Sequence, residues 1–322
     1  MTNIVLLVVD TLRDKDLEQK GEEIAPFLTK MGEENIKIEN YYSNASWTAP
    51  AHATMFTGEL PSSHGTTTEN PFFEKENKLV KTMKDHGYKT IGLSENEWVS
   101  GFSGLDQGFD EFKHYSIAKK GGKVWKETWD KDSEFEDMSR GRTKKWLYFV
   151  KRIIQEKDFL STKTLSGHIL SKFKRKIGIN KEADYNSGFD QAVINDALKR
   201  LEEEQNNFFF INLMPVHAYY SFNNEQKEEF LPDVEDSDIP EITHTYPLNE
   251  YLVDERKSEY FVRNRKKAYK ASISYVDSQI EKLYVNAPDD TMFIVVGDHG
   301  ELTGEYEFND RPIVHHHLGT FK

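Results

Sequence analysis

The sequence predicts an α/β fold with a mostly parallel central sheet and helices on both faces of that sheet. Four short apolar runs, rich in Val, Ile and Phe, alternate with helical patterns, as expected for strands that are buried on both faces. These runs are Ile4–Val9, Lys89–Leu93, Phe208–Leu213 and Met292–Gly297. The length of 322 residues fits one large domain, and a content of 37% hydrophobic residues is typical of a globular chain.

Helical periodicity fills the intervals between these runs. Helices are predicted over Ile24–Glu34, Asn77–His86 and Ala192–Glu204. A further helix is indicated by an apolar stripe with the spacing of one helical face, made of Tyr269, Ile273, Val276, Ile280 and Leu283. The acidic stretch Asn223–Arg256 contains prolines and lacks periodicity, so a long surface excursion is predicted there.

A short helix is predicted to begin near Thr48, where the sequence reads Thr-Ala-Pro-Ala-His. Proline near the start and Gly58 after the end are typical helix boundaries, and they place Thr48 near the N-cap. Threonine is an ordinary N-cap residue, so capping alone explains its presence. The functional alternative is that a helix N-terminus attracts anions, and that a hydroxyl there, bound to a divalent cation, ionises and attacks an ester.

Titratable residues follow three of the predicted strands directly. Asp10 follows the first strand, His217 comes shortly after the third, and Asp298 and His299 follow the fourth. Because ligands of parallel α/β sheets bind at the carboxyl ends of the strands, these side chains are expected at one edge. A single Asp in such a position is often only a helix cap, but three strand ends of this kind favour a common site.

Charge is unevenly distributed along the chain. The net charge of −13 disfavours nucleic acid as a partner, so none is expected. The segment 116–181 is basic, with 18 Lys and Arg against 8 Asp and Glu, and it departs from the strand–helix alternation. A helical insertion or cap is predicted there. Its charge suits an anionic substrate, membrane or glycan, although a solvated helical surface explains it equally well.

Two absences narrow the class of protein. There is no cysteine, which excludes disulfides, thiolate metal ligands and a cysteine nucleophile. The apolar runs are too short for a signal peptide or a membrane span, so a soluble cytoplasmic protein is expected.

Several motifs occur in an order that resembles the sulfatase-like branch of the alkaline phosphatase superfamily. The set spans residues 1–115 and about 190–322. Its parts are Val8-Val9-Asp10-Thr11-Leu12-Arg13, Ala25-Pro26-Phe27-Leu28, the approach Asn40-Tyr41-Tyr42-Ser43-Asn44-Ala45-Ser46-Trp47 to the Thr48 run, Thr57-Gly58-Glu59-Leu60-Pro61-Ser62-Ser63-His64-Gly65, Gly87-Tyr88-Lys89-Thr90, Gly108-Phe109-Asp110 and Val296-Gly297-Asp298-His299-Gly300-Glu301.

The resemblance implies a metal site and a nucleophile. Asp10, Asp298 and His299 would hold one divalent ion, with the Thr48 oxygen completing its shell. Hard oxygen ligands with one imidazole suit Mn²⁺, Mg²⁺, Ca²⁺ or Zn²⁺, and a second ion stays an alternative.

The resemblance also assigns substrate contacts to histidines. His217 would contact the substrate oxygens or protonate the leaving group, and His317 would contact the transferred group, with His315 and His316 as competitors for that role. His52 replaces the arginine that is usual in sulfatases, and a structural role is expected for it and for His64.

Two departures from the family pattern matter. Sulfatases of the usual kind oxidise a Cys or Ser to formylglycine, which Thr48 cannot become. Its secondary alcohol is instead similar to the nucleophile of the family's phosphodiesterases, phosphonate hydrolases and lipid phospho-group transferases. The family also continues past the Asp-His turn with a C-terminal subdomain. That subdomain is expected to be absent from this chain, which is predicted to be a single domain over 1–322.

The expected function is metal-dependent hydrolysis of an anionic phosphate, phosphonate or sulfate ester with Thr48 as nucleophile. One alternative is a lipid or glycan phospho-group transferase that uses segment 116–181 to contact an anionic membrane or glycan. A second alternative is a truncated, non-catalytic family member that binds anions.

Overall fold

The structure is a computed structural model that describes residues 2–115, 188–203, 206–217, 220–243, 255–307 and 312–315. The helical insertion or cap predicted at 116–181 lies outside the described residues, as does His317. No helix in the described part of the chain is long and apolar enough to cross a bilayer.

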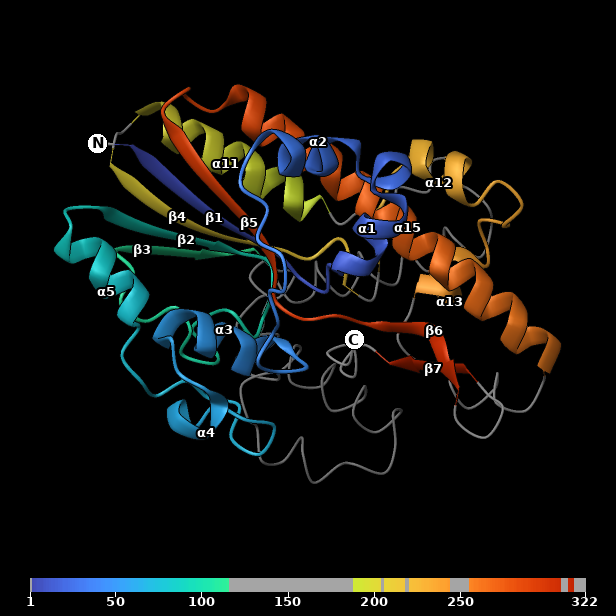
Figure 1. Cartoon of the computed structure of the whole chain (residues 1–322), viewed down its shortest axis with the longest axis horizontal. Helices are drawn as coiled ribbons and strands as arrows, with labels where there is room; N and C mark the ends of the chain where they lie inside the picture. The colour runs from blue at the N-terminus through green and yellow to red at the C-terminus, as the bar shows by residue number, and fades with distance from the viewer. Residues whose placement is uncertain are drawn as a thin grey trace, which may run out of the picture. The chain divides into compact units, whose positions relative to one another are not determined.

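Five parallel strands form the central sheet (Figure 1). They are β1 (Asn3–Val9), β2 (Lys89–Ser94), β3 (Glu111–His114), β4 (Asn207–Leu213) and β5 (Thr291–Gly297). Their order is β3-β2-β4-β1-β5, and each neighbouring pair is parallel. The mostly parallel sheet is therefore confirmed, and all four predicted runs are strands of it. Within this sheet, β3 was not predicted.

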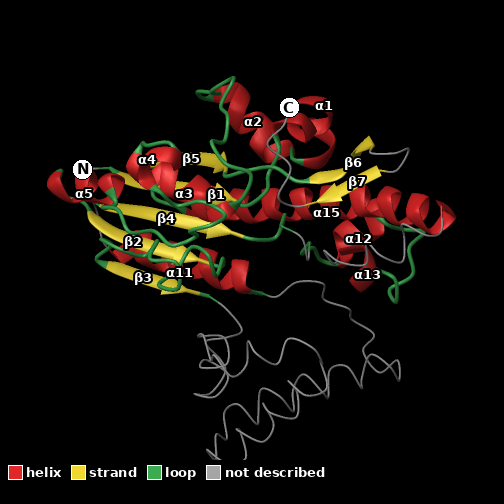
Figure 2. Ribbon diagram, turned by 90° about the horizontal axis from the view of Figure 1, so that it is seen from below, coloured by secondary structure: helices red, strands yellow, loops and turns green. Residues whose placement is uncertain are grey.

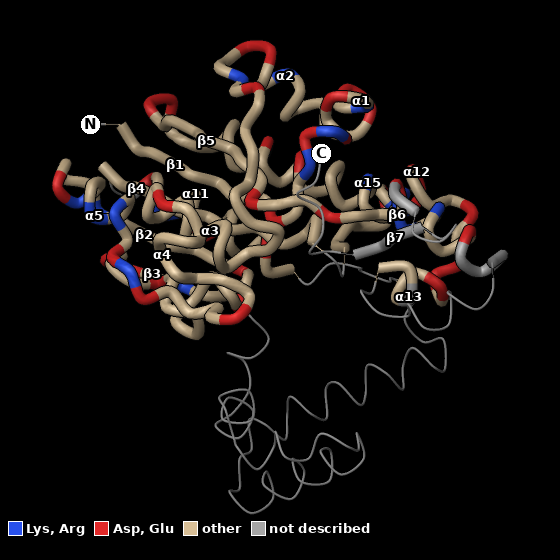
Figure 3. The backbone as a smooth tube through the Cα atoms, turned by 60° about the horizontal axis from the view of Figure 1, so that its bottom comes forward, with Lys and Arg blue, Asp and Glu red and all other residues tan. Residues whose placement is uncertain are grey.

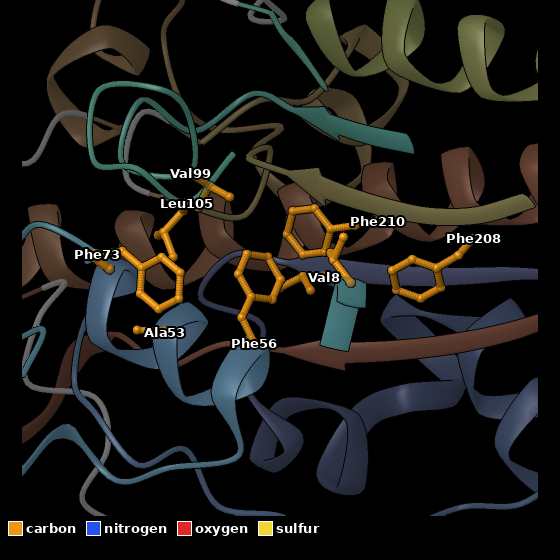
Figure 4. Close-up of a cluster of buried hydrophobic side chains, with 10 residues drawn as sticks. Val8, Ala53, Phe56, Phe73, Val99, Leu105, Phe208 and Phe210 are labelled. Atoms are coloured by element: carbon orange, nitrogen blue, oxygen red, sulfur yellow. The ribbon is translucent and has the colours of Figure 1, made fainter. Parts of the chain in front are cut away.

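One face of the sheet is covered by α3 (Thr48–Thr57) and α5 (Lys78–Asp85). The rings of Phe56 on α3 and Phe210 on β4 meet edge to face, with centroids 5.0 Å apart. Val8 of β1 and Phe208 of β4 belong to the same buried cluster (Figure 4). Burial of such side chains is the main force that holds a helix against a sheet.

The opposite face is covered by α11 (Phe189–Glu203) and α15 (Glu255–Asn286). Figures 1 and 2 show these two helices on the side of the sheet away from α3 and α5. Side chains alternate between the two faces along a strand, so Val5, Leu7 and Val9 of β1 all lie on this face. All three are fully buried. Burial on both faces explains why β1 is apolar throughout rather than at every second residue.

The predicted helix Ile24–Glu34 is wrong at its start. The structure has two helices here, α1 (Asp14–Ile24) and α2 (Pro26–Glu34), separated by Ala25 with φ −147° and ψ 63°. The break is caused by Pro26, since proline disfavours a helical conformation in the residue before it.

The stretch between β4 and α15 is also more regular than predicted. It contains α12 (Asn224–Phe230) and α13 (Ile239–Thr243), which are too short to show periodicity in the sequence. The Asn223 side chain caps α12 by accepting hydrogen bonds from the backbone N–H groups of Glu225 and Gln226. The remaining described elements are α4 (Pro61–His64) and an antiparallel pair, β6 (Leu302–Glu307) and β7 (Pro312–His315).

Basic and acidic residues both occur along outer elements such as α1 and α5 (Figure 3). Pairs such as Lys20–Glu23 and Lys84–Asp110, both at 2.7 Å, are partly or largely exposed. Exposed pairs contribute little to stability, so the acidic balance of the chain does not determine the fold.

One long-range contact fixes the first helices onto α15. Asp277 of α15 is almost fully buried, and its two carboxylate oxygens accept hydrogen bonds from the backbone N–H groups of Phe27 (3.0 Å) and Leu28 (2.8 Å). These N–H groups belong to the first turn of α2, which has no cap from its own N-cap residue.

Replacement of this cap gives a test of the fold. We expect Asp277→Ala to lower the free energy of unfolding by about 1 kcal/mol, the usual cost of losing a helix cap. Burial raises the pKa of Asp277 to about 6. At neutral pH the cost of burying the charged carboxylate therefore offsets part of the stabilisation that the cap provides. Urea unfolding followed by circular dichroism measures the change. The exposed neighbour Glu281→Ala is the control, and equal stability of both variants would contradict the capping role.

Candidate metal centre

Two buried carboxylates leave adjacent strands at the same level. Asp10 follows β1 and Asp298 follows β5 directly, and these strands are parallel neighbours with Val9 opposite Gly297. Both side chains are almost completely buried. The pairing of β1 with β5 therefore places Asp10 and Asp298 at the same edge of the sheet, as predicted.

His299 completes a compact cluster with these two acids. Its Nε2 atom lies 3.5 Å from Asp10 Oδ1 and 3.5 Å from Asp298 Oδ2. One potential ligand atom from each of the three residues lies within 4.8 Å of the others. Two carboxylates and one imidazole at this spacing are a common donor set for a divalent cation.

The hydrogen bonds of the two acids leave one oxygen of each facing the cluster. Asp298 Oδ1 accepts from the backbone N–H groups of Thr11 (3.1 Å) and His299 (2.8 Å). Asp298 Oδ2 and Asp10 Oδ1 are buried without a hydrogen-bond partner. A buried carboxylate oxygen without a partner is costly, and a cation between the two would remove that cost. The site thus fits a divalent metal ion.

Negative charge is crowded in this buried cluster. Burial and the nearby charge of Asp10 raise the pKa of Asp298. Burial opposes the charged form of His299, but the attraction of Asp298 and Asp10 outweighs it and raises the pKa of His299. His299 Nδ1 lies 3.0 Å from the Gly300 carbonyl, which can only accept, so Nδ1 carries a proton and Nε2 faces the acids.

Thr48 lies beside this cluster as the first residue of α3. The N-cap is Trp47, whose side chain makes no capping hydrogen bond, so Thr48 lies next to the N-cap, as predicted. Its hydroxyl oxygen lies 3.4 Å from Asp10 Oδ2 and 3.3 Å from His299 Nε2. The hydroxyl is therefore turned toward the acids and does not cap α3.

Helix α3 is fixed in this position by its own sequence. Pro50 in the first turn has no N–H that would need a partner. Ala49, Ala53 and Phe56 are fully buried against the sheet. Gly58 ends the helix with φ 69°, a left-handed conformation that glycine adopts without strain.

Two histidines near α3 have structural contacts, as predicted. His52 Nδ1 lies 2.9 Å from the Thr48 carbonyl and 3.6 Å from Asp298 Oδ2, so it ties the start of the helix to the cluster. His64 Nδ1 accepts from the Thr66 backbone N–H, and its Nε2 lies 3.1 Å from the Thr54 hydroxyl.

The loop after β1 is held by three hydrogen bonds. Thr11 has φ 62°, a strained conformation for a β-branched residue. Besides its bond to Asp298, its hydroxyl donates to the Val216 carbonyl (2.8 Å) and its carbonyl accepts from Tyr269 (2.7 Å). Gly297 leaves room for this loop, because a Cβ there would lie 2.4 Å from the Leu12 carbonyl oxygen.

The loop that carries His217 is tied to the same edge. His217 is half-buried in the turn after β4, and its backbone N–H donates to the Met214 carbonyl at 3.0 Å. The preceding Val216 is bonded to Thr11, next to Asp10. The backbone thus places His217 near the end of β4. The structure brings Asp10, Thr48, Asp298 and His299 into one cluster, in which His299 contacts each of the other three.

Asn96 was not predicted as a site residue. It lies just after β2, and its Nδ2 atom is 2.7 Å from Asp10 Oδ2 and 3.3 Å from Thr48 Oγ1. Its position just beyond the predicted strand Lys89–Leu93 indicates a residue at the end of a strand, but the prediction was limited to Asp and His at such positions.

A buried charged network was also missed. Glu301 Oε1 accepts hydrogen bonds from Tyr220 and from Arg265, each at 2.5 Å, and all three residues are almost fully buried. The Arg265 guanidinium also lies over the Tyr220 ring, 4.8 Å from its centroid. The network anchors the turn after β5 to α15.

Comparisons with known proteins show the family of this chain. The family model "Sulfatase" matches residues 2–321, so the chain belongs to the sulfatase family. It is 21% identical over 338 residues to an arylsulfatase of Clostridium perfringens, covering 95% of this chain and 64% of that protein. It is 30% identical over 132 residues to the N-acetylgalactosamine-6-sulfatase of Homo sapiens, covering 34% of this chain.

Solved structures share the fold at low identity. The phosphonate monoester hydrolase of Agrobacterium radiobacter superimposes with a TM-score of 0.61 at 14% identity, covering 96% of this chain and 64% of that one. The periplasmic domain of the phosphoethanolamine transferase EptC from Campylobacter jejuni gives 0.54 at 13%, covering 99% and 73%. The chain therefore spans just under two thirds of the length of the arylsulfatase and of the phosphonate hydrolase.

Metal content tests the cluster. We expect Asp298→Asn to reduce the bound divalent metal from about one ion per chain to a trace, because the amide removes the negative charge of one of the three proposed ligands. Elemental analysis of the purified protein measures this. Asp110→Asn is the control, since Asp110 is a partly exposed carboxylate beside Thr90 at the start of β2. Equal metal content in the Asp298 variant and the unsubstituted protein would contradict the site.

Proposed function

We propose that this protein is a metal-dependent hydrolase of phosphate, phosphonate or sulfate esters and that Thr48 is its nucleophile. The observation that carries the proposal is the Thr48 hydroxyl at 3.3–3.4 Å from His299 and Asp10, on the first residue of a helix. A hydroxyl in this position is close to the donor set for a cation and to a helix N-terminus, which together favour its ionised form.

Each residue of the cluster has a distinct part in the proposed reaction. Asp10, Asp298, His299 and the Thr48 oxygen would hold a divalent ion, which supplies Lewis-acid stabilisation of negative charge on the ester oxygens. Asp10 Oδ2 accepts the hydrogen bond of the Thr48 hydroxyl and orients its oxygen. The N-terminus of α3 adds a favourable potential for an anionic substrate. His217 donates a proton to the departing alcohol oxygen.

The identity of the nucleophile narrows the substrate class. A threonine cannot be converted to formylglycine, so the hydrated-aldehyde chemistry of the usual sulfatases is excluded here. Threonine suits direct displacement at phosphorus, which makes phosphate and phosphonate esters the preferred substrates. The fold likeness to a phosphonate monoester hydrolase is consistent with this preference.

The second candidate is transfer of a lipid or glycan phospho-group to an acceptor alcohol. It is favoured by the fold likeness to phosphoethanolamine transferases and by the basic composition of segment 116–181. In that case an acceptor alcohol, and not water, resolves the covalent intermediate. Analysis of the products in the presence of an added alcohol separates the two candidates, because only a transferase converts most of the ester into the alcohol's ester.

Substitution of the nucleophile tests the proposal. We expect Thr48→Ala to lower kcat by about 10⁴-fold or more, the scale seen when a nucleophile is removed. Thr48→Ser should retain measurable activity because it keeps a hydroxyl. Release of nitrophenol from nitrophenyl phosphate, phosphonate and sulfate esters measures turnover.

The matched control is Thr57→Ala in the same helix. Thr57 is similarly buried, but its hydroxyl donates to the Ala53 carbonyl at 2.7 Å, away from the cluster. This variant should be less stable yet keep its turnover. Undiminished turnover in Thr48→Ala would show that another group attacks the ester.

A further inference from the structure

Asn96 occupies a fixed position at the carboxyl end of β2. It is 4% exposed. Its backbone N–H donates to the Ser94 hydroxyl at 3.1 Å, and this hydroxyl in turn donates to the Asn96 carbonyl at 3.3 Å. The last residue of the strand therefore holds the backbone of Asn96, and this fixes the position of its Cα atom.

The orientation of the Asn96 amide follows from its partners. Its Oδ1 atom accepts a hydrogen bond from the Trp98 backbone N–H at 2.8 Å. Because a backbone N–H can only donate, the oxygen must be on this side and the NH₂ group on the other. The Trp98 contact thus directs both amide hydrogens toward the cluster of Asp10, Asp298 and His299.

The two amide hydrogens meet two oxygen atoms. Nδ2 lies 2.7 Å from Asp10 Oδ2 and 3.3 Å from Thr48 Oγ1. The second contact places a neutral N–H donor on the oxygen that would attack the ester. No other side-chain amide donates to Thr48 Oγ1 among the hydrogen bonds of the described residues.

We propose that Asn96 is a further catalytic residue, whose N–H stabilises negative charge on Thr48 Oγ1 when the covalent intermediate is hydrolysed. This role rests on the proposed function, in which Thr48 is the nucleophile. It assigns Asn96 to the second step of the reaction more than to the first.

The balance of charge in the two steps explains this assignment. Before the first step the Thr48 hydroxyl loses its proton to solvent. In the first step the Oγ1–phosphorus bond forms, the bond to the leaving alcohol breaks with its electron pair on the alcohol oxygen, and this oxygen takes the proton of His217. In the second step water attacks phosphorus and gives a proton back to His217, and the phosphorus–Oγ1 bond breaks with its electron pair returning to Oγ1. Charge leaves Oγ1 in the first step and returns to it in the second, so a donor fixed on Oγ1 accelerates the second step more.

Two variants isolate the donor. Asn96→Ala removes the amide altogether. Asn96→Asp keeps an acceptor for the Trp98 N–H, so the loop keeps its bond, but it replaces the donor with an acceptor. In both variants we expect kcat to fall by about 100-fold, the usual effect of losing one preorganised donor to a developing charge. KM should fall as well, because hydrolysis of the intermediate becomes rate-limiting.

The measurement is rapid-mixing kinetics with the nitrophenyl ester that the unsubstituted protein turns over. We expect a burst of nitrophenol of about one equivalent per chain, followed by slow turnover, as intermediates accumulate. Mass spectrometry of quenched Asn96→Ala should find the adduct on Thr48. The control is Asn77→Ala. Asn77 has the same exposed fraction, 4%, and caps α5 through the Val80 N–H. This variant should lose stability but show no burst and no loss of kcat.

The outcomes separate this role from the proposed function. If Thr48→Ala is inactive while Asn96→Ala and Asn96→Asp keep the kcat of the unsubstituted protein, the role of Asn96 is wrong and the nucleophile stands. A fall in kcat without a burst or an adduct also overturns the role, since it indicates a structural effect. If Thr48→Ala keeps its turnover, both the nucleophile and this role of Asn96 are wrong.

Discussion

Two buried carboxylate oxygens that face one another without partners are the constraint around which this structure is arranged. Asp10 Oδ1 and Asp298 Oδ2 lie at the ends of adjacent parallel strands, where water cannot solvate them. Their mutual repulsion and desolvation would destabilise the fold unless a cation lay between them. The backbone N–H groups of Thr11 and His299 fix the second acid, and the Arg265–Glu301 pair anchors the turn that carries it.

The catalytic proposal depends on the same arrangement. A threonine hydroxyl is a poor nucleophile in water, and here its oxygen lies beside the Asp10 carboxylate and the His299 imidazole at the start of α3. In the proposed function, the acids and the histidine form the metal site, and the threonine takes the place of the formylglycine of the usual sulfatases. The proposal therefore joins a metal site to a nucleophile suited to displacement at phosphorus.

The sequence predicted the strands and the ends of the strands well, because apolar runs and the residues after them are local features. Asp10, Asp298 and His299 could be placed at one edge before any pairing was known. Asn96 was missed, since its contacts with Asp10 and Thr48 depend on β2 and β1 lying on either side of β4. The Arg265–Glu301 pair joins residues 36 positions apart, and no local pattern shows such a contact. The break at Ala25 could be predicted from Pro26, because proline disfavours a helical conformation in the residue before it.

The stereochemical course of the reaction tests the central claim most directly. Two in-line displacements, the first by Thr48 and the second by water, invert phosphorus twice. Hydrolysis of an isotopically chiral phosphate ester that the protein turns over, or its transfer to an alcohol, should therefore proceed with net retention of configuration. Net inversion would show a single displacement by water and would contradict Thr48 as the nucleophile.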